Sequence, residues 1–125
     1  MATTSILILG AGRSSTSLIS YLLEKAPANS WQVTVGDFAL KAAQEQIGNS
    51  SYGKAILFDI RNEELSRSVI ASSSVVISLL PAHLHPLVAK ICLIEKKHLL
   101  TASYVSDEMK PFHAEALANG LLFFK

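Results

Sequence analysis

A pair of glycines directly after a short apolar run offers the clearest chemistry in this sequence. The run covers residues 5–9, and the turn that follows it contains Gly10, Gly12, Arg13, Ser14 and Ser15. In such a turn the first glycine permits a sharp bend, the second lets the backbone approach a ligand, and the N-terminus of the next helix attracts phosphate groups. A glycine pair alone is a weak signal, but here it lies between a predicted strand and a predicted helix, as the motif requires. The segment therefore predicts a site for the pyrophosphate of a dinucleotide, against the alternative of an ordinary strand-to-helix turn.

Ser15 stands where the motif usually has a third glycine. That glycine normally lets the helix pack closely on the strand. A serine adds a hydroxymethyl group, so the helix would lie slightly further out. Its hydroxyl has two possible partners, a phosphate or the helix itself, and the alternative is that Ser15 is simply a tolerated small residue.

Acidic residues end the next two predicted strands. At the end of the second strand, the Asp37 carboxylate would accept hydrogen bonds from the adenosine ribose and repel a 2′-phosphate. It therefore favours NAD over NADP, although Arg13 and Lys41 could offset the repulsion. Asp59 ends the third strand, where its carboxylate or the following amide can meet the adenine edge. For each aspartate the alternative is a cap on the following helix.

The fourth predicted strand closes on Leu79, Leu80 and Pro81. Their backbone would run along the nicotinamide side of the site, or Pro81 only terminates the strand. His83 and His85 follow closely, but their spacing matches no zinc pattern and no cysteine or carboxylate cluster accompanies them. We interpret both histidines mainly as polar residues of a helix N-terminal turn, and the sequence predicts no metal site.

Three hydroxyl groups come at or after the end of the fifth predicted strand, on Thr101, Ser103 and Tyr104. At the carboxyl end of a sheet they would suit a polar substrate or the nicotinamide ribose. The alternative is the start of a solvated loop.

A regular alternation of strands and helices would bring these residues together. Strands are predicted at 5–9, 31–35, 54–58, 75–80, 98–101 and 121–124, and helices at 13–25, 38–47, 62–71 and 84–95, with a loop at 27–30. Residues 107–119 predict a turn and then a helix whose regular part starts at Pro111. This alternation predicts an α/β fold: a Rossmann-type doubly wound parallel sheet in three α/β/α layers, with strand order 3-2-1-4-5-6. The ligand would then lie at the carboxyl ends of strands 1 and 4, where the order reverses.

Composition narrows the function classes. The length of 125 residues is typical of one domain. Of these residues, 50% are hydrophobic and only 17% are charged, and this apolar composition indicates strands buried on both faces or a surface covered by another domain. The net charge of +1 gives no argument for nucleic acid or an anionic membrane, and no apolar run is long enough to span a bilayer. The N-terminus lacks the basic region of a signal peptide. Cys92 is the only cysteine, which excludes an internal disulfide and predicts a reducing, cytoplasmic setting.

Four segments of the chain, residues 10–13, 75–81, 85–90 and 101–106, are more specific together than any one of them alone. In this order, and over nearly the whole chain, they resemble the saccharopine dehydrogenase (L-glutamate-forming), or saccharopine reductase, family. The segments S-L-L-P…H-P-L-V-A-K and T-A-S-Y-V-S are far more specific than the glycine turn.

The resemblance implies a domain binding NAD or NADP in an oxidoreductase of lysine metabolism. Such an enzyme interconverts saccharopine, an amino-acid substrate, with glutamate and aminoadipate semialdehyde by hydride transfer at a carbon–nitrogen bond. By the same resemblance, Asp59, Ile60 and the end of the fourth strand lie against the cofactor, and Ser103 and Tyr104 touch saccharopine. The segment around Asp37 varies within the family, so the choice between the two cofactors stays open.

The family continues beyond a sixth strand into a substrate and dimerisation domain. We therefore expect residues 1–125 to be one domain of a longer protein, inactive alone, with a homodimer possible for the full-length protein. Two alternatives stay open: a nucleotide-sensing module without catalysis, and a related amino-acid reductase with another substrate.

Overall fold

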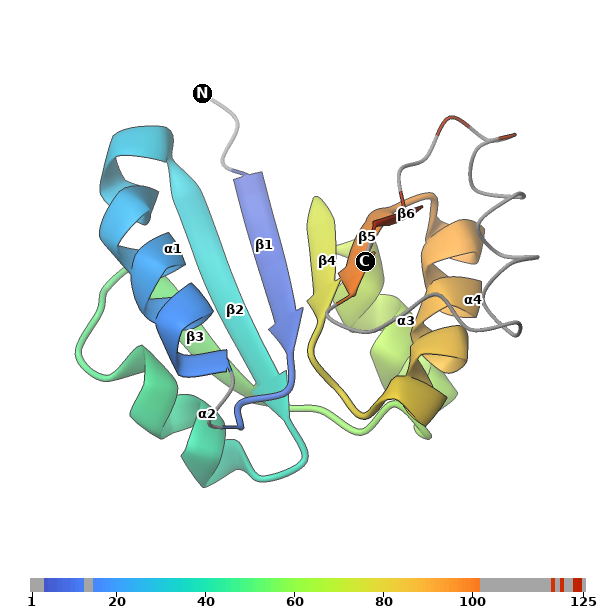
Figure 1. Ribbon diagram of the computed structural model, residues 1–125, viewed down its shortest axis with the longest axis horizontal. Coiled ribbons are helices and arrows are strands. Elements are labelled where there is room, and N and C mark those ends of the chain that lie inside the picture. The colour runs from blue at the N-terminus through green and yellow to red at the C-terminus, as the bar shows by residue number, and fades with distance from the viewer. Residues whose placement is uncertain (1–3, 13–14, 102–117, 119, 121–122, 125) are drawn as a thin grey trace.

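The computed structural model describes residues 4–12, 15–101, 118, 120 and 123–124, in which strands and helices alternate (Figure 1). The strands are β1 (Thr4–Leu9), β2 (Trp31–Asp37), β3 (Gly53–Leu57), β4 (Val75–Ser78), β5 (His98–Thr101) and β6 (Phe123–Phe124). The helices are α1 (Thr16–Asn29), α2 (Leu40–Ile47), α3 (Glu63–Ala71) and α4 (His85–Glu95), and a 3-10 turn, η2 (Ala82–Leu84), precedes α4. The turn and helix predicted over 107–119 fall, apart from residue 118, outside the described residues.

The strands form one parallel sheet in the order β3-β2-β1-β4-β5-β6. The predicted fold class and strand order are therefore confirmed, with β6 a short addition at one edge. The order reverses between β1 and β4, whose residues pair from Ile6 with Val75 to Leu9 with Ser78. We call the carboxyl ends of these two strands the switch point, which is where a doubly wound sheet binds its ligand.

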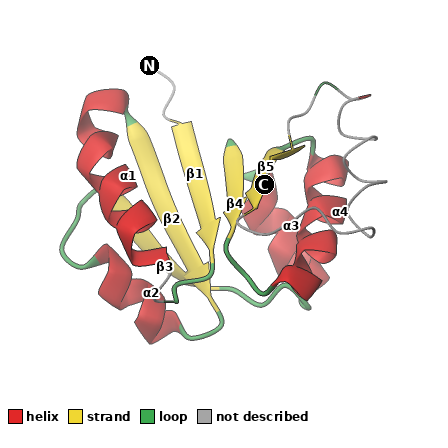
Figure 2. Ribbon diagram, viewed as in Figure 1, coloured by secondary structure: helices red, strands yellow, loops and turns green. Residues whose placement is uncertain are grey.

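Helices cover both faces of the sheet (Figure 2). Ile6 and Ile8 of β1 pack with buried residues of α1 and α2, whereas Leu7 and Leu9 pack with buried residues of α4 and the C-terminal part of α3. Because successive side chains of a strand point to opposite faces, a strand covered on both sides is apolar throughout. This explains the continuous apolar run of β1 and part of the low charge of the chain.

Several element boundaries differ from the prediction, and two of these differences are larger or lie at the predicted site. The fourth strand ends at Ser78, so residues 79–81 form the connection to η2 and not the last residues of a strand. An apolar run shows burial but not where ladder hydrogen bonding stops. Helix α1 also continues through Pro27, which we had placed in a loop, and ends when Ser30 adopts a left-handed conformation. Ala26, fully buried against the sheet, holds this last turn in place.

No helix in the part of the chain that the structure describes has the length and apolar character needed to cross a bilayer.

Candidate functional site

The glycine turn lies at the switch point, between β1 and α1 (Figure 1). Gly10 has a φ of +103°, which side chains of L-residues rarely tolerate, and its amide donates to the Gly36 carbonyl over 2.8 Å. A Cβ at Gly10 would lie 3.0 Å from the carbonyl carbon and oxygen of Leu79. Gly12 is exposed, and a Cβ there would meet no other atom within 4 Å. One glycine therefore fits the turn against the end of β4, and the other leaves open space beside the backbone.

Ser15 is fully buried at the start of α1. Its hydroxyl donates to the Gly12 carbonyl over 2.6 Å, and its amide donates to the same oxygen over 3.0 Å. The hydroxyl therefore bonds back to the turn, and its contact with a phosphate stays a prediction. Arg13 and Ser14 lie outside the described residues.

Asp37 ends β2, and its carboxylate reaches the glycine turn. Oδ2 accepts a hydrogen bond from the Ala11 amide over 2.6 Å, and Oδ1 accepts one from the Ala39 amide over 2.7 Å. The residue at the N-cap of α2 is Ala39, so Asp37 does not occupy the cap position that we considered as its alternative role. Asp37 instead ties the turn to the β2–α2 connection and places a negative charge beside it.

Gln46 of α2 is a supporting residue that sequence reasoning missed. Its side-chain amide donates to Thr16 Oγ1 over 2.9 Å, with longer contacts to the carbonyl oxygens of Ala11 at 3.4 Å and Gly12 at 3.5 Å. These partners are 30 to 35 residues away along the chain. No local sequence pattern predicts the contact between Gln46 and Thr16, because it forms only when α2 packs beside α1.

The second predicted aspartate, Asp59, lies two residues beyond β3, which ends at Leu57 and not at the predicted residue 58. The Arg61 amide donates to Asp59 Oδ1 over 3.0 Å, whereas the cap of α3 is Asn62, whose side chain accepts from the Leu65 amide over 3.1 Å. The helix-cap alternative therefore belongs to Asn62. The side chain of Ile60 is buried in the core, so its predicted cofactor contact would have to come from its backbone.

The segment after β4 lies directly against the glycine turn. The Leu79 amide donates to the Leu9 carbonyl over 2.7 Å, and the Leu84 amide donates to the Pro81 carbonyl over 2.9 Å. Leu80 packs partly buried against the core, and Pro81 is exposed. The structure thus brings this segment together with Gly10, as the predicted site requires.

A buried polar pair brackets this segment. Ser78, the last residue of β4, and His85, the first residue of α4, are 0% and 2% exposed. Ser78 Oγ and His85 Nδ1 are hydrogen-bonded over 2.9 Å. We had interpreted His85 as a polar residue of a helix N-terminal turn, and the only sequence signal for the pair is a serine ending an apolar strand seven residues before a histidine.

The buried histidine predicts a pH dependence of stability. Burial lowers the pKa of the His85 imidazole from its ordinary value of 6.5. As the pH falls below 6.5, His85 becomes protonated in the unfolded chain but stays neutral in the folded chain. The free energy of unfolding therefore decreases with falling pH, until the pH is below the pKa of His85 in the folded chain. Urea denaturation between pH 7.5 and pH 5 should show a steeper loss for the unaltered chain than for His85→Asn. Parallel curves would contradict a neutral buried imidazole.

The remaining candidate residues are the single cysteine, the predicted substrate contacts and any metal ligands. Cys92 is fully buried, and burial raises the pKa of its thiol to about 12, so it stays protonated and behaves as a small core residue. Ser103 and Tyr104 lie outside the described residues. Among the residues that the structure does describe, no three histidine, cysteine, aspartate or glutamate side chains are placed to hold a metal ion.

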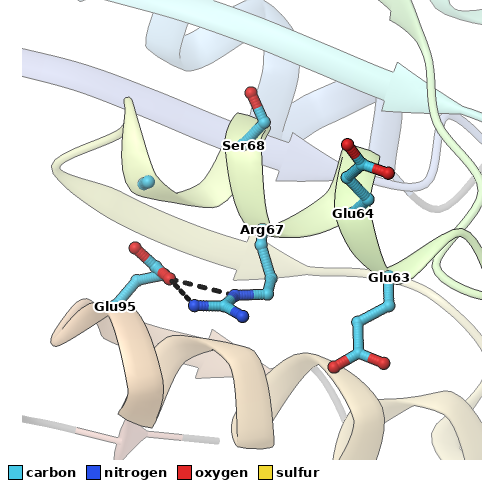
Figure 3. Close-up of a pocket in the computed structure, with 6 residues that line it drawn as sticks. Glu63, Glu64, Arg67, Ser68 and Glu95 are labelled. Atoms are coloured by element: carbon cyan, nitrogen blue, oxygen red, sulfur yellow. Dashed lines mark hydrogen bonds and ion pairs between the residues drawn. The ribbon is translucent and has the colours of Figure 1, made fainter.

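A hollow of about 550 Å³ lies between α3 and α4, and none of the predicted site residues lines it (Figure 3). Arg67 of α3 reaches across to α4, where its Nε and Nη2 donate to Glu95 Oε2 over 3.2 and 3.1 Å. An ion pair this exposed to solvent contributes little to stability. The hollow is a surface feature of the helix layer and not part of the switch point.

Comparison with known proteins decides the family. The sequence profile described as "Saccharopine dehydrogenase NADP binding domain" matches residues 6–123. The chain belongs to this family. The resemblance predicted from the S-L-L-P and T-A-S-Y segments is therefore confirmed.

Relatives in the saccharopine dehydrogenase family are much longer than this chain. Alpha-aminoadipic semialdehyde synthase of Arabidopsis thaliana is 34% identical over an alignment 135 residues long, which covers 94% of this chain and 13% of that protein. Saccharopine dehydrogenase (NADP(+), L-glutamate-forming) of Saccharomyces cerevisiae is 32% identical over 117 residues, which cover 94% of this chain and 25% of that protein. The structure of apo histidine-tagged saccharopine dehydrogenase (L-Glu forming) from the same yeast matches with a TM-score of 0.87 at 30% identity, over 96% of this chain and 26% of that one.

Proposed function

We propose that this chain is the dinucleotide-binding domain of a larger oxidoreductase of the saccharopine dehydrogenase type. The observation that carries the proposal is the glycine turn at the switch point, with the Asp37 carboxylate hydrogen-bonded to it and open space at Gly12. These features fit a dinucleotide. Gly12 leaves room for a pyrophosphate beside the backbone, and Asp37 offers a carboxylate where a ribose would lie.

The cofactor in this proposal is NAD or NADP, with NAD favoured by Asp37. A carboxylate at the end of β2 repels a 2′-phosphate. The yeast relative is named for NADP(+), and an exposed Lys41 at the start of α2 offers a positive charge that could offset Asp37. Gly10, Gly12 and the 79–81 segment lie at the switch point, and Asp59 follows β3 at the same end of the parallel sheet, which supports the roles proposed for them.

The reaction in this proposal belongs to the whole protein. The nicotinamide would supply the hydride acceptor for the carbon of the CH–NH bond of saccharopine. With loss of the nitrogen proton to solvent and addition of water, the products would be glutamate and aminoadipate semialdehyde. Ser103 and Tyr104 would contact the amino-acid substrate, and a second domain would supply the other wall of the site. Family membership supports this assignment, as do the names of the yeast and plant relatives. A homodimer of the full-length protein is part of the same proposal.

The compartment is also a proposal. One buried thiol suits a reducing compartment such as the cytoplasm. The bovine relative, 38% identical over 106 residues, is named mitochondrial.

Calorimetric titration of this chain with NAD and NADP tests the proposal. We expect weak binding of both, tighter for NAD, and little or no turnover from the domain alone. Absence of binding to either dinucleotide would overturn the nucleotide function, and a tenfold or greater preference for NADP would overturn the interpretation of Asp37.

Substitution of Asp37 makes that test residue-specific. Asp37→Ala should weaken NAD binding about tenfold, the effect of losing hydrogen bonds to a charged group, and weaken NADP binding less. Asp37→Asn is the matched control, because it keeps the shape and removes the charge. It should shift the affinity ratio toward NADP, whereas an unchanged ratio in both variants would show that the carboxylate does not select the cofactor.

A further inference from the structure

The buried Ser78–His85 pair stands at the centre of the switch point. Ser78 pairs with Leu9 of β1 on one side and Thr101 of β5 on the other, and Leu9 immediately precedes Gly10. His85 opens α4, seven residues later. The hydrogen bond between them closes a loop whose free part is η2 and the 79–81 segment.

That segment forms part of the site through its backbone. The Gly10 backbone approaches Leu79 so closely that a Cβ at Gly10 would lie 3.0 Å from its carbonyl and 3.3 Å from the Leu80 nitrogen. A dinucleotide whose ribose meets Asp37 at the end of β2 must extend its other half past the glycine turn toward β4. The 79–81 segment is therefore the wall on the nicotinamide side.

Burial alone does not explain a polar pair at these two positions. Ser78 and His85 are almost fully buried, and the other buried residues of β4 and α4 are apolar. Replacing both members of a buried hydrogen-bonded pair by apolar groups of similar shape is often nearly neutral for stability. The pair orients the start of α4 relative to the end of β4, because a hydrogen bond has a preferred distance and angle between its donor and acceptor.

We propose that Ser78 and His85 are positioning residues, whose hydrogen bond sets the 79–81 segment at the distance from the glycine turn that the nicotinamide half of the cofactor needs. The inference rests on the proposed dinucleotide function. It assigns neither residue a contact with the reacting atoms.

Binding of whole and half ligands separates this role from general support of the fold. The probes are NADH or NADPH, whichever the unaltered chain binds more tightly, and ADP, which lacks the nicotinamide half. Ser78→Ala should weaken the dinucleotide about fivefold, the effect of one hydrogen bond, and leave ADP affinity within about twofold. His85→Leu should weaken the dinucleotide at least as much, and the double variant should bind no more weakly than the weaker single variant, because both substitutions remove the same hydrogen bond.

His85→Asn supplies the rescue, since its side-chain amide can place a hydrogen-bonding atom where Nδ1 lies and so restore affinity. If His85→Leu does not fold, Ser78→Ala and His85→Asn carry the test, with circular dichroism and thermal melting recorded for each. Equal losses for ADP and the dinucleotide would overturn the proposal in favour of a structural role, and so would unchanged affinity in Ser78→Ala. Failure of the unaltered chain to bind any of the probes would instead overturn the dinucleotide function, and this inference with it.

Discussion

Gly10→Ala is expected to destabilise the domain by about 2 to 5 kcal/mol, the largest stability effect of any single methyl group added at the switch point. Two costs combine. The φ of +103° is strained for any residue with a Cβ, and the new methyl group would press on the Leu79 carbonyl at 3.0 Å. This carbonyl belongs to the backbone directly after β4, where the Leu79 amide is hydrogen-bonded to Leu9 of β1, so it cannot move aside as a flexible side chain would. Urea denaturation of the two proteins measures the difference.

Gly48→Ala is the matched control for this prediction. Gly48 also has a positive φ, +59°, but a Cβ there would meet no atom within 4 Å. It therefore reports the cost of backbone strain alone, and Gly10→Ala should be destabilised further by the contact with Leu79. Equal losses in the two variants would show that the close approach of the turn to the 79–81 segment carries no energy.

The fold was predictable because the strongest sequence signals are burial signals. Apolar runs such as 5–9 and 75–80 show strands covered on both faces, and the strict handedness of β–α–β connections then leaves few strand orders. Boundaries were less accurate for the same reason. Leu79 and Leu80 are as apolar as the strand before them, yet the ladder stops at Ser78.

The site was predictable in position but not in its hydrogen bonds. Residue type and place in the sequence put Asp37 at the end of the second strand, whereas the bond from the Ala11 amide to its carboxylate depends on how the turn folds back. The hydrogen bond from Gln46 to Thr16 and the Ser78–His85 hydrogen bond are tertiary contacts. The types of these residues do not indicate a contact, because only the packing of the helices and strands brings the partners together. The sequence therefore predicts the contacts of buried polar residues poorly. In this domain, those contacts support the switch point.

Gly12→Ala should have the opposite signature to Gly10→Ala: a stable fold and a loss of dinucleotide affinity of at least about tenfold, or 1.4 kcal/mol. The φ of Gly12 lies outside the left-handed region and a Cβ would meet no protein atom within 4 Å, so the alanine should fold at least as well as the glycine. The same open space is where the pyrophosphate would approach the backbone, so a methyl group there would hold the ligand away.

Thermal melting and calorimetric titration of Gly12→Ala against NAD and NADP check both halves of this expectation. Adenosine, which has no phosphate, is the control ligand, and its affinity should not change. Retained dinucleotide affinity in a folded Gly12→Ala would place the phosphates elsewhere and remove the observation on which the proposed function rests. A Gly12→Ala that melts early would show that the space beside Gly12 serves the fold and not a ligand.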